Sequence, residues 1–168
     1  MANPVHFSGV EVFDLAIQTE HNGRAFYEAA AAGANSEEVQ RAMVHLAHAE
    51  GEHEATFRRL RDEAYPPVEG QDAEALPETY AGELAENMTA LLRARVLPDE
   101  ATGLRVVAEM ADDMAALDFA IAFEKDTILF MQQMREMIPE DEREPLAVLI
   151  QQEHIHVRLL QGLKDKRA

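Results

Sequence analysis

Apolar residues recur at intervals of three and four along four long stretches of the chain, and this spacing constrains the fold more than any other feature. Helix-favouring Ala, Leu, Glu, Met, Gln and Arg dominate these stretches, and no Asn-Gly turn separates two β-branched runs. The pattern therefore predicts an all-α protein. Its 168 residues are enough for one domain with its own core, so we expect residues 1–168 to form a single domain.

The first half of the chain predicts a helical hairpin over residues 8–64. Ser8 and Glu11 have the spacing of a capping box, which opens a helix that should run as far as the Gly-Ala-Asn-Ser turn at 33–36. The Asn or the Ser of this turn can cap a second helix, which should continue to about Ala64.

A long crossover is expected at residues 65–98. Its first part, 65–78, is rich in Pro and Gly and should break the second helix. Residues 79–96 then predict a short helix lying across the bundle. A second hairpin should follow at 99–165.

This second hairpin contains the third and fourth predicted long helices. Pro98 and Asp99 should open the third helix, which is expected to run without interruption to about Met137, where Pro139 ends it. Asp141 is the expected N-cap of the fourth helix. Two helical hairpins joined by a long crossover form one of the known four-helix-bundle topologies.

The two halves of the chain also resemble each other. Residues 13–26 align without gaps on 117–130, and residues 46–53 fall on 149–156. We interpret this similarity as a duplicated hairpin, although helical sequences of low complexity can imitate a duplication.

Each of the four long helices places one Glu on its apolar seam, the line of residues that faces the core. The seam of the second helix passes through Leu46, Glu50, His53 and Phe57 in steps of three and four, and the fourth helix repeats the Glu-x-x-His spacing. The seam residues that could carry chemistry are Glu20, Glu50, His53, Glu124, Glu153 and His156.

These acids should lie at one level of the bundle. Glu20 and Glu50 are equally far in sequence from the first turn, and Glu124 and Glu153 are equally far from the second, so each pair sits level at a rise of about 1.5 Å per residue. Four ionised carboxylates in an apolar core would be costly unless something compensates their charge. Two divalent metals would do so, each also taking one neutral imidazole.

The absence of cysteine narrows the kinds of metal site, because it excludes zinc knuckles and cysteine-ligated iron centres. Alone, the Glu-x-x-His spacing is a weak signal, since such pairs are ordinary neighbours on a helix. Alternatively, the acids are partly exposed, the histidines are satisfied in the core, and the protein is a metal-free interaction module. The common level of six residues on four seams favours metal binding. Tyr27, on the seam of Glu20, either packs in the core or hydrogen-bonds near the metals.

The pattern resembles the ferritin-like di-iron carboxylate superfamily, in which two helices each give one Glu and the other two each give Glu-x-x-His. Within it, the chain is most similar to the rubrerythrin family, over roughly residues 10–64 and 100–165. The resemblance implies a ferritin-like four-helix bundle and two iron ions, with manganese or zinc as possible occupants. It also implies a role for each residue. Glu50 and Glu153 would bridge the two metals, Glu20 and Glu124 would be terminal carboxylate ligands, and His53 and His156 would each bind one metal.

By the same resemblance, the protein would be an oxidoreductase that reduces peroxide or oxygen, or one that oxidises ferrous iron. Rubrerythrins typically append a cysteine-rich rubredoxin domain, which this chain lacks, so an external electron donor is expected. The family commonly has a further Glu where this chain has Thr127, which leaves peroxidase-type activity open. The alternative function is a non-enzymatic iron- or zinc-binding helical bundle.

The net charge of −17 argues against two classes of partner, because it would repel nucleic acid and anionic membranes. No apolar run is long enough for a membrane span, and the first residues do not resemble a secretory signal. We therefore expect a cytoplasmic protein. A homodimer is also expected, because the crossover could pair hairpins between chains.

Overall fold

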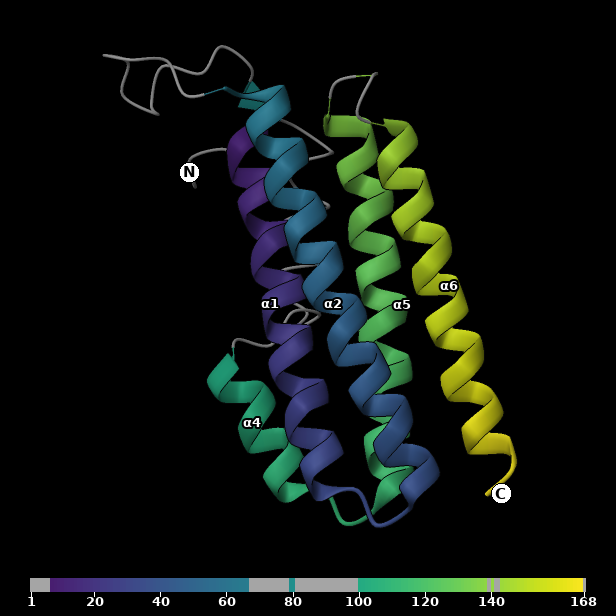
Figure 1. The fold of residues 1–168 in the computed structure, drawn as a ribbon. Coiled ribbons are helices and arrows are strands. Elements are labelled where there is room, and N and C mark those ends of the chain that lie inside the picture. The colour runs from purple at the N-terminus through teal and green to yellow at the C-terminus, as the bar shows by residue number, and fades with distance from the viewer. Residues whose placement is uncertain (1–6, 67–78, 81–99, 139, 141–142, 168) are drawn as a thin grey trace, which may run out of the picture.

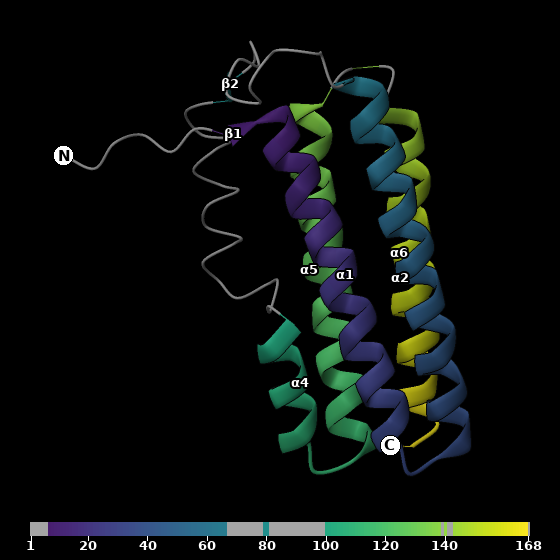
Figure 2. The same ribbon diagram turned by 60° about the vertical axis from the view of Figure 1, so that its left-hand side comes forward.

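The computed structural model describes residues 7–66, 79–80, 100–138, 140 and 143–167. Four long helices lie side by side as a bundle, and a shorter helix, α4, lies beside α1 (Figures 1 and 2). The all-α bundle expected from the sequence is confirmed. The helices are α1 (Gly9–Gly33), α2 (Glu37–Ala64), α4 (Glu100–Glu109), α5 (Asp113–Met137) and α6 (Arg143–Asp165).

The start of α1 has the predicted capping box. The Ser8 hydroxyl accepts a hydrogen bond from the Glu11 backbone N–H at 3.2 Å, and the Glu11 carboxylate accepts one from the Ser8 N–H at 2.7 Å. These bonds satisfy backbone donors that a helix start leaves without intrahelical partners. Ser36 occupies the N-cap position of α2 as expected, but its side chain makes no capping bond and instead accepts from Arg167 at 2.7 Å.

The prediction of one continuous third helix from Pro98 to Met137 is wrong. The chain leaves the helical path after α4, and α5 begins at Asp113. Asp112 is the N-cap of α5, and its carboxylate accepts a hydrogen bond from the Ala115 N–H at 3.0 Å. Met110, which one continuous helix would contain, therefore lies in the connection between α4 and α5.

The predicted start of the crossover helix is also wrong for the two residues of it that the structure describes. Thr79–Tyr80 forms strand β2, which pairs antiparallel with strand β1 (Phe7–Ser8). The rest of that expected helix, 81–96, lies outside the described residues, and so does the predicted N-cap Asp141.

A pair of interhelical contacts repeats between the two hairpins. Arg61 near the end of α2 bonds to Asp14 of α1 at 2.8 Å, and Lys164 near the end of α6 bonds to Asp118 of α5. In the sequence alignment of the two halves, Asp14 falls on Asp118. Because the same positions make the same type of contact, the structure supports the interpretation of a duplicated hairpin.

The apolar core is divided into two clusters along the bundle. One cluster includes Phe26, Leu46 and Leu117, and the other includes Phe13 and Phe57. The acids and histidines singled out in the sequence belong to neither cluster, although they are buried. A polar layer thus lies in the interior with apolar packing around it, where water has little access.

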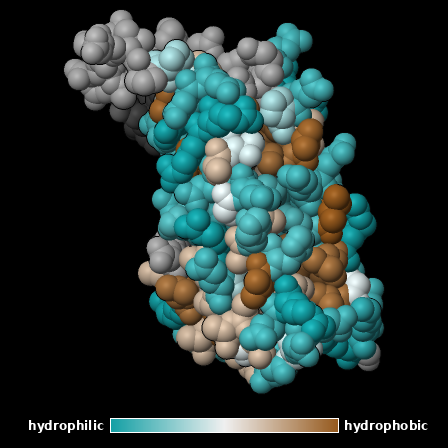
Figure 3. Space-filling view, in the orientation of Figure 1, coloured by the Kyte–Doolittle hydropathy of each residue, from teal (hydrophilic) through white to brown (hydrophobic). Residues whose placement is uncertain are grey.

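The outer face in Figure 3 is mostly hydrophilic, with hydrophobic patches that include a row along α6. Among the residues that the structure describes, the large apolar side chains with the greatest exposure are Val44, Val148 and Ile155, at 58%, 54% and 53%. Among the described residues, no helix has the length and apolar character required to cross a membrane.

Candidate metal centre

The structure brings all six residues singled out in the sequence together in the interior of the bundle. One comes from α1, two from α2, one from α5 and two from α6. None is more than 5% exposed. We refer to them as the Glu/His cluster, which consists of Glu20, Glu50, His53, Glu124, Glu153 and His156.

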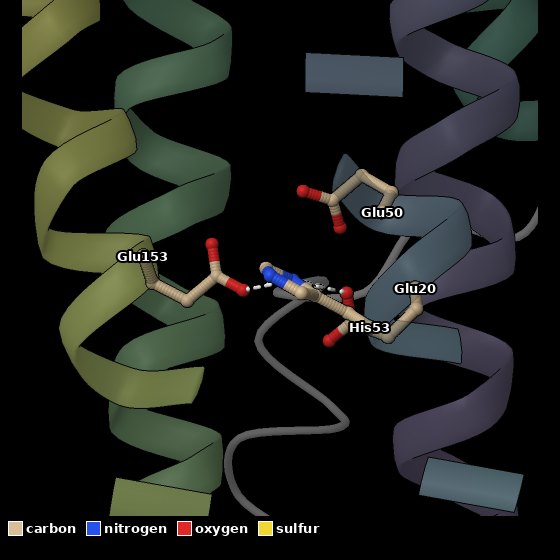
Figure 4. A group of neighbouring side chains, drawn as sticks. All are labelled: Glu20, Glu50, His53 and Glu153. Carbon is tan, nitrogen blue, oxygen red and sulfur yellow. Dashed lines mark ion pairs between the residues drawn. The ribbon is translucent and has the colours of Figure 1, made fainter. Parts of the chain in front are cut away.

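One half of the cluster is drawn in Figure 4, where Glu20, Glu50, His53 and Glu153 point toward one another. One potential ligand atom from each of these four residues lies within 4.8 Å of the others. The Nδ1 atom of His53 lies 2.7 Å from Oε1 of Glu153 and 3.4 Å from Oε2 of Glu20. Three carboxylates and one imidazole therefore converge on one point.

The other half has the same composition and consists of Glu50, Glu124, Glu153 and His156, again with potential ligand atoms within 4.8 Å of one another. The Nδ1 atom of His156 lies 2.8 Å from Oε2 of Glu153 and 3.5 Å from Oε1 of Glu124. Glu50 and Glu153 belong to both halves, one from each hairpin. This sharing is what two neighbouring metals with two bridging carboxylates require.

The two imidazoles lie beside each other on α2 and α6. Their ring centroids are 5.5 Å apart, and the ring planes are inclined by 19°, so the rings of His53 and His156 are stacked. Each ring directs its Nδ1 atom at the carboxylates of its own half.

Several polar atoms of the cluster have no hydrogen-bond partner among the described residues. They are both carboxylate oxygens of Glu20, Oε1 of Glu50, Nδ1 of His53, Oε2 of Glu124 and Oε1 of Glu153. Buried polar atoms are normally paired, so a group of unpaired ones calls for a ligand. Carboxylate oxygens and imidazole nitrogens in this ratio suit iron or manganese, and the residues present therefore fit a pair of such ions.

Burial and mutual repulsion hold protons on the carboxyl groups of the metal-free protein. Burial, followed by the charges of Glu20 and Glu153, raises the pKa of Glu50 well above its ordinary value. The pKa of Glu124 is raised to about 8, by burial and then by the charge of Glu153. Burial is also the main cause of the raised pKa of Glu20.

The pKa values of the two histidines are shifted in the direction that favours the charged form of the ring. Burial lowers the pKa of His53, but the Glu153 and Glu20 carboxylates beside its Nδ1 atom outweigh this effect and raise the pKa to about 11. The pKa of His156 behaves in the same way: burial lowers it, but Glu124 and Glu153 outweigh burial and raise it to about 9. Burial would raise the pKa of Glu153, but the two imidazoles lower it well below its usual range. Protons thus take the place of metal charge when no metal is bound.

Tyr27 combines the two roles that the sequence left open. Its ring is fully buried in the apolar core, and its hydroxyl donates a hydrogen bond to Oε1 of Glu124 at 2.5 Å. Burial and then the charge of Glu124 raise the pKa of this phenol well above its ordinary value, so the hydroxyl keeps its proton.

Sequence reasoning missed two residues that contact the cluster. Gly23 leaves room for Glu50, because a Cβ atom at position 23 would lie 3.0 Å from Oε2 of Glu50 and 2.8 Å from the Phe123 ring. A Gly inside a long helix was the available signal, since it weakens the helix unless packing requires it. Gln152 lies next to Glu153, and its Oε1 atom is 3.0 Å from Nε2 of His53. No pattern marked it, because an exposed Gln on a helix is ordinary.

The chain was compared with known proteins in three ways. The family model described as Rubrerythrin matches residues 11–164. No curated protein matches the chain. Among solved structures, it is similar to a proposed ferritin-like diiron-carboxylate protein from Thermotoga maritima, with a TM-score of 0.71 and 23% sequence identity over 97% of this chain and 98% of that chain. This structural likeness supports the ferritin-like fold.

Proposed function

Because the chain belongs to the rubrerythrin family, we propose that its Glu/His cluster holds two iron ions and that the protein is an oxidoreductase that reduces peroxide or oxygen. One observation carries the proposal. Two groups of three carboxylates and one imidazole meet in the interior and share Glu50 and Glu153. Oxidation of ferrous iron is a second outcome of the same chemistry.

The residues of the cluster have distinct roles in this proposal. Glu50 and Glu153 would contact both ions, Glu20 and His53 would hold one, and Glu124 and His156 would hold the other. Four ionised carboxylates balance the charge of two divalent ions. Binding therefore requires the carboxyl groups and the imidazoles to release the protons that they carry in the metal-free protein.

When bound, the two irons supply the electrons for the reduction of peroxide or oxygen. The chain itself contributes burial, because the apolar clusters around the site limit the access of water. Tyr27 holds the Glu124 carboxylate through its hydroxyl. Thr127, where the family commonly has Glu, is 1% exposed, and its hydroxyl has no hydrogen-bond partner among the described residues.

The experiment that tests the proposal is anaerobic loading with ferrous iron, followed by peroxide and a supplied chemical reductant. We expect two irons per chain, oxidised together and then recycled over repeated turnovers. Glu50→Ala should abolish loading of the pair. Glu52→Ala is the matched control, because Glu52 is on the same helix and 71% of its side chain is exposed.

Loading without recycling would support the alternative, a non-enzymatic iron- or zinc-binding bundle. Iron that binds equally well to the Glu50→Ala variant would contradict a site at the Glu/His cluster. The external electron donor, the homodimer and the cytoplasmic location stay predictions.

A further inference from the structure

Residues outside the Glu/His cluster contact its two halves differently, although the sequences of the two hairpins resemble each other. In one half, the outer nitrogen of an imidazole is fixed, because Nε2 of His53 bonds to Oε1 of Gln152 at 3.0 Å. In the aligned sequence of the other half, Ala49 takes the place of Gln152, and its methyl group accepts no hydrogen bond. Within the described part of the chain, His156 accordingly makes hydrogen bonds only through Nδ1.

The carboxylates show the opposite asymmetry. Glu124 accepts a hydrogen bond from the Tyr27 hydroxyl at 2.5 Å, whereas neither oxygen of Glu20 has a hydrogen-bond partner among the described residues. In the aligned sequence, Met131 takes the place of Tyr27, and a thioether has no proton to donate. In one half, therefore, a residue outside the cluster bonds to the imidazole, and in the other half a residue outside the cluster bonds to the carboxylate.

The contact with Gln152 determines which nitrogen of His53 is available to a metal. The Gln152 oxygen can only accept, so the proton of a neutral His53 ring must sit on Nε2. The lone pair of that ring is then on Nδ1, which faces Glu20 and Glu153. Such outer contacts fix the tautomer and the orientation of a metal-binding histidine, and their removal typically lowers metal affinity roughly 10–100-fold.

We propose that Gln152 is a positioning residue for His53 and that it makes the two metal positions unequal in affinity. This inference rests on the proposed function, since it presupposes that the cluster binds metal. Gln152 itself is exposed and lies outside the cluster, so it acts through the imidazole and not as a ligand.

The test is an anaerobic titration of the full chain with Co²⁺, followed by its visible absorption, which reports each ion as it binds. The wild-type protein should bind two ions in two separable steps. Gln152→Ala should weaken one step roughly 10–100-fold and leave the other unchanged. Gln152→Glu, which keeps an acceptor oxygen, should restore the weakened step.

Gln151 provides the matched controls, because it is exposed and adjacent in sequence. Gln151→Ala should leave both steps unchanged, and Gln151→Glu shows how much an added negative charge alone contributes. The gain in metal affinity from the Ala variant to the Glu variant is compared at positions 152 and 151. If this gain is no larger at position 152 than at position 151, the hydrogen bond is not the cause and the inference fails.

Failure of the inference can be separated from failure of the proposed function. A wild-type protein that binds two ions, with a Gln152→Ala variant of the same two affinities, would overturn the role of Gln152 alone. A wild-type protein that binds no Co²⁺ would overturn the metal site itself. Circular dichroism of each variant shows that its helices are intact before the titration is read.

Discussion

Replacement of Glu50 by Leu should make the metal-free protein more stable while destroying the proposed metal site. Glu50 is 1% exposed, and its pKa is raised first by burial and then by the charges of Glu20 and Glu153. Leu has a similar size, carries no charge and needs no hydrogen bond. The substitution therefore removes a cost that the metal-free fold bears in order to keep the site.

The cost can be bounded from the titration of the carboxyl group. A carboxyl group with the ordinary pKa of 4.5 must take up a proton to remain neutral in the folded protein, which at pH 7 costs roughly 3 kcal/mol. Replacement of buried charged groups by apolar ones stabilises other proteins by about 1–4 kcal/mol, which is the same range. For a chain of this size, a gain of about 2–3 kcal/mol corresponds to a rise in Tm of roughly 4–12 °C.

The assay is thermal unfolding of EDTA-treated protein, followed by circular dichroism at pH 7 and at pH 5. By the same arithmetic, proton uptake at pH 5 costs roughly 1 kcal/mol or less. The gain in stability from Glu50→Leu should therefore be smaller at pH 5 than at pH 7. Glu52→Leu is the control, and it should stay within about 0.5 kcal/mol of wild type because this side chain is exposed. If Glu50→Leu lowers the Tm of the metal-free protein and still binds two metals, Glu50 is not at the centre of the site.

Three further predictions concern the same cluster. The metal-free protein should lose stability as the pH rises from about 6 to 9, because folded Glu124 and His156, with pKa values of about 8 and 9, keep protons that the unfolded chain releases at lower pH. Metal affinity should rise over the same range, so the melting temperature should fall with pH without metal and stay nearly constant at saturating metal; equal slopes in the two series would contradict this. Tyr27→Phe removes the donor to Glu124 and should cost about 1–3 kcal/mol in urea denaturation of the metal-free protein, whereas an unchanged midpoint would mean that the bond adds nothing. His53→Ala should leave one strong metal position and Glu50→Ala none, as metal analysis after dialysis would measure; equal losses would argue against the shared role of Glu50.

The bundle and the meeting of the six side chains could be predicted because both depend on local spacing. Steps of three and four place Glu50 and His53 on one helical face, and equal distances from a turn place Glu20 level with Glu50. These relations hold whatever the details of packing, and the structure indeed brings the residues within 4.8 Å in two groups.

Features that depend on contacts between helices could not be predicted in the same way. The break between α4 and α5 was missed because the apolar spacing continues through Met110 and Met114, although Asp112 offers an N-cap. The sequence suggested that Tyr27 could reach the cluster but did not identify Glu124 as its acceptor, since the two residues are 97 positions apart. Gln152 carried no signal at all, because its role exists only when α6 lies beside α2.

Asp113, the first residue of α5, joins the two hairpins at the turn between α1 and α2. Its carboxylate accepts hydrogen bonds from the backbone N–H groups of Asn35 and Ser36 at 2.8 and 2.9 Å. This contact fixes the height of one hairpin relative to the other along the bundle axis. The number of residues between the contact and a side chain then determines the height of that side chain. One residue inserted between Asp113 and Glu124 would carry Glu124 about 1.5 Å along the axis and about 100° around it, out of the cluster. The Glu/His cluster should therefore tolerate many substitutions elsewhere on these helices but very few insertions or deletions between the Asp113 contact and its own residues.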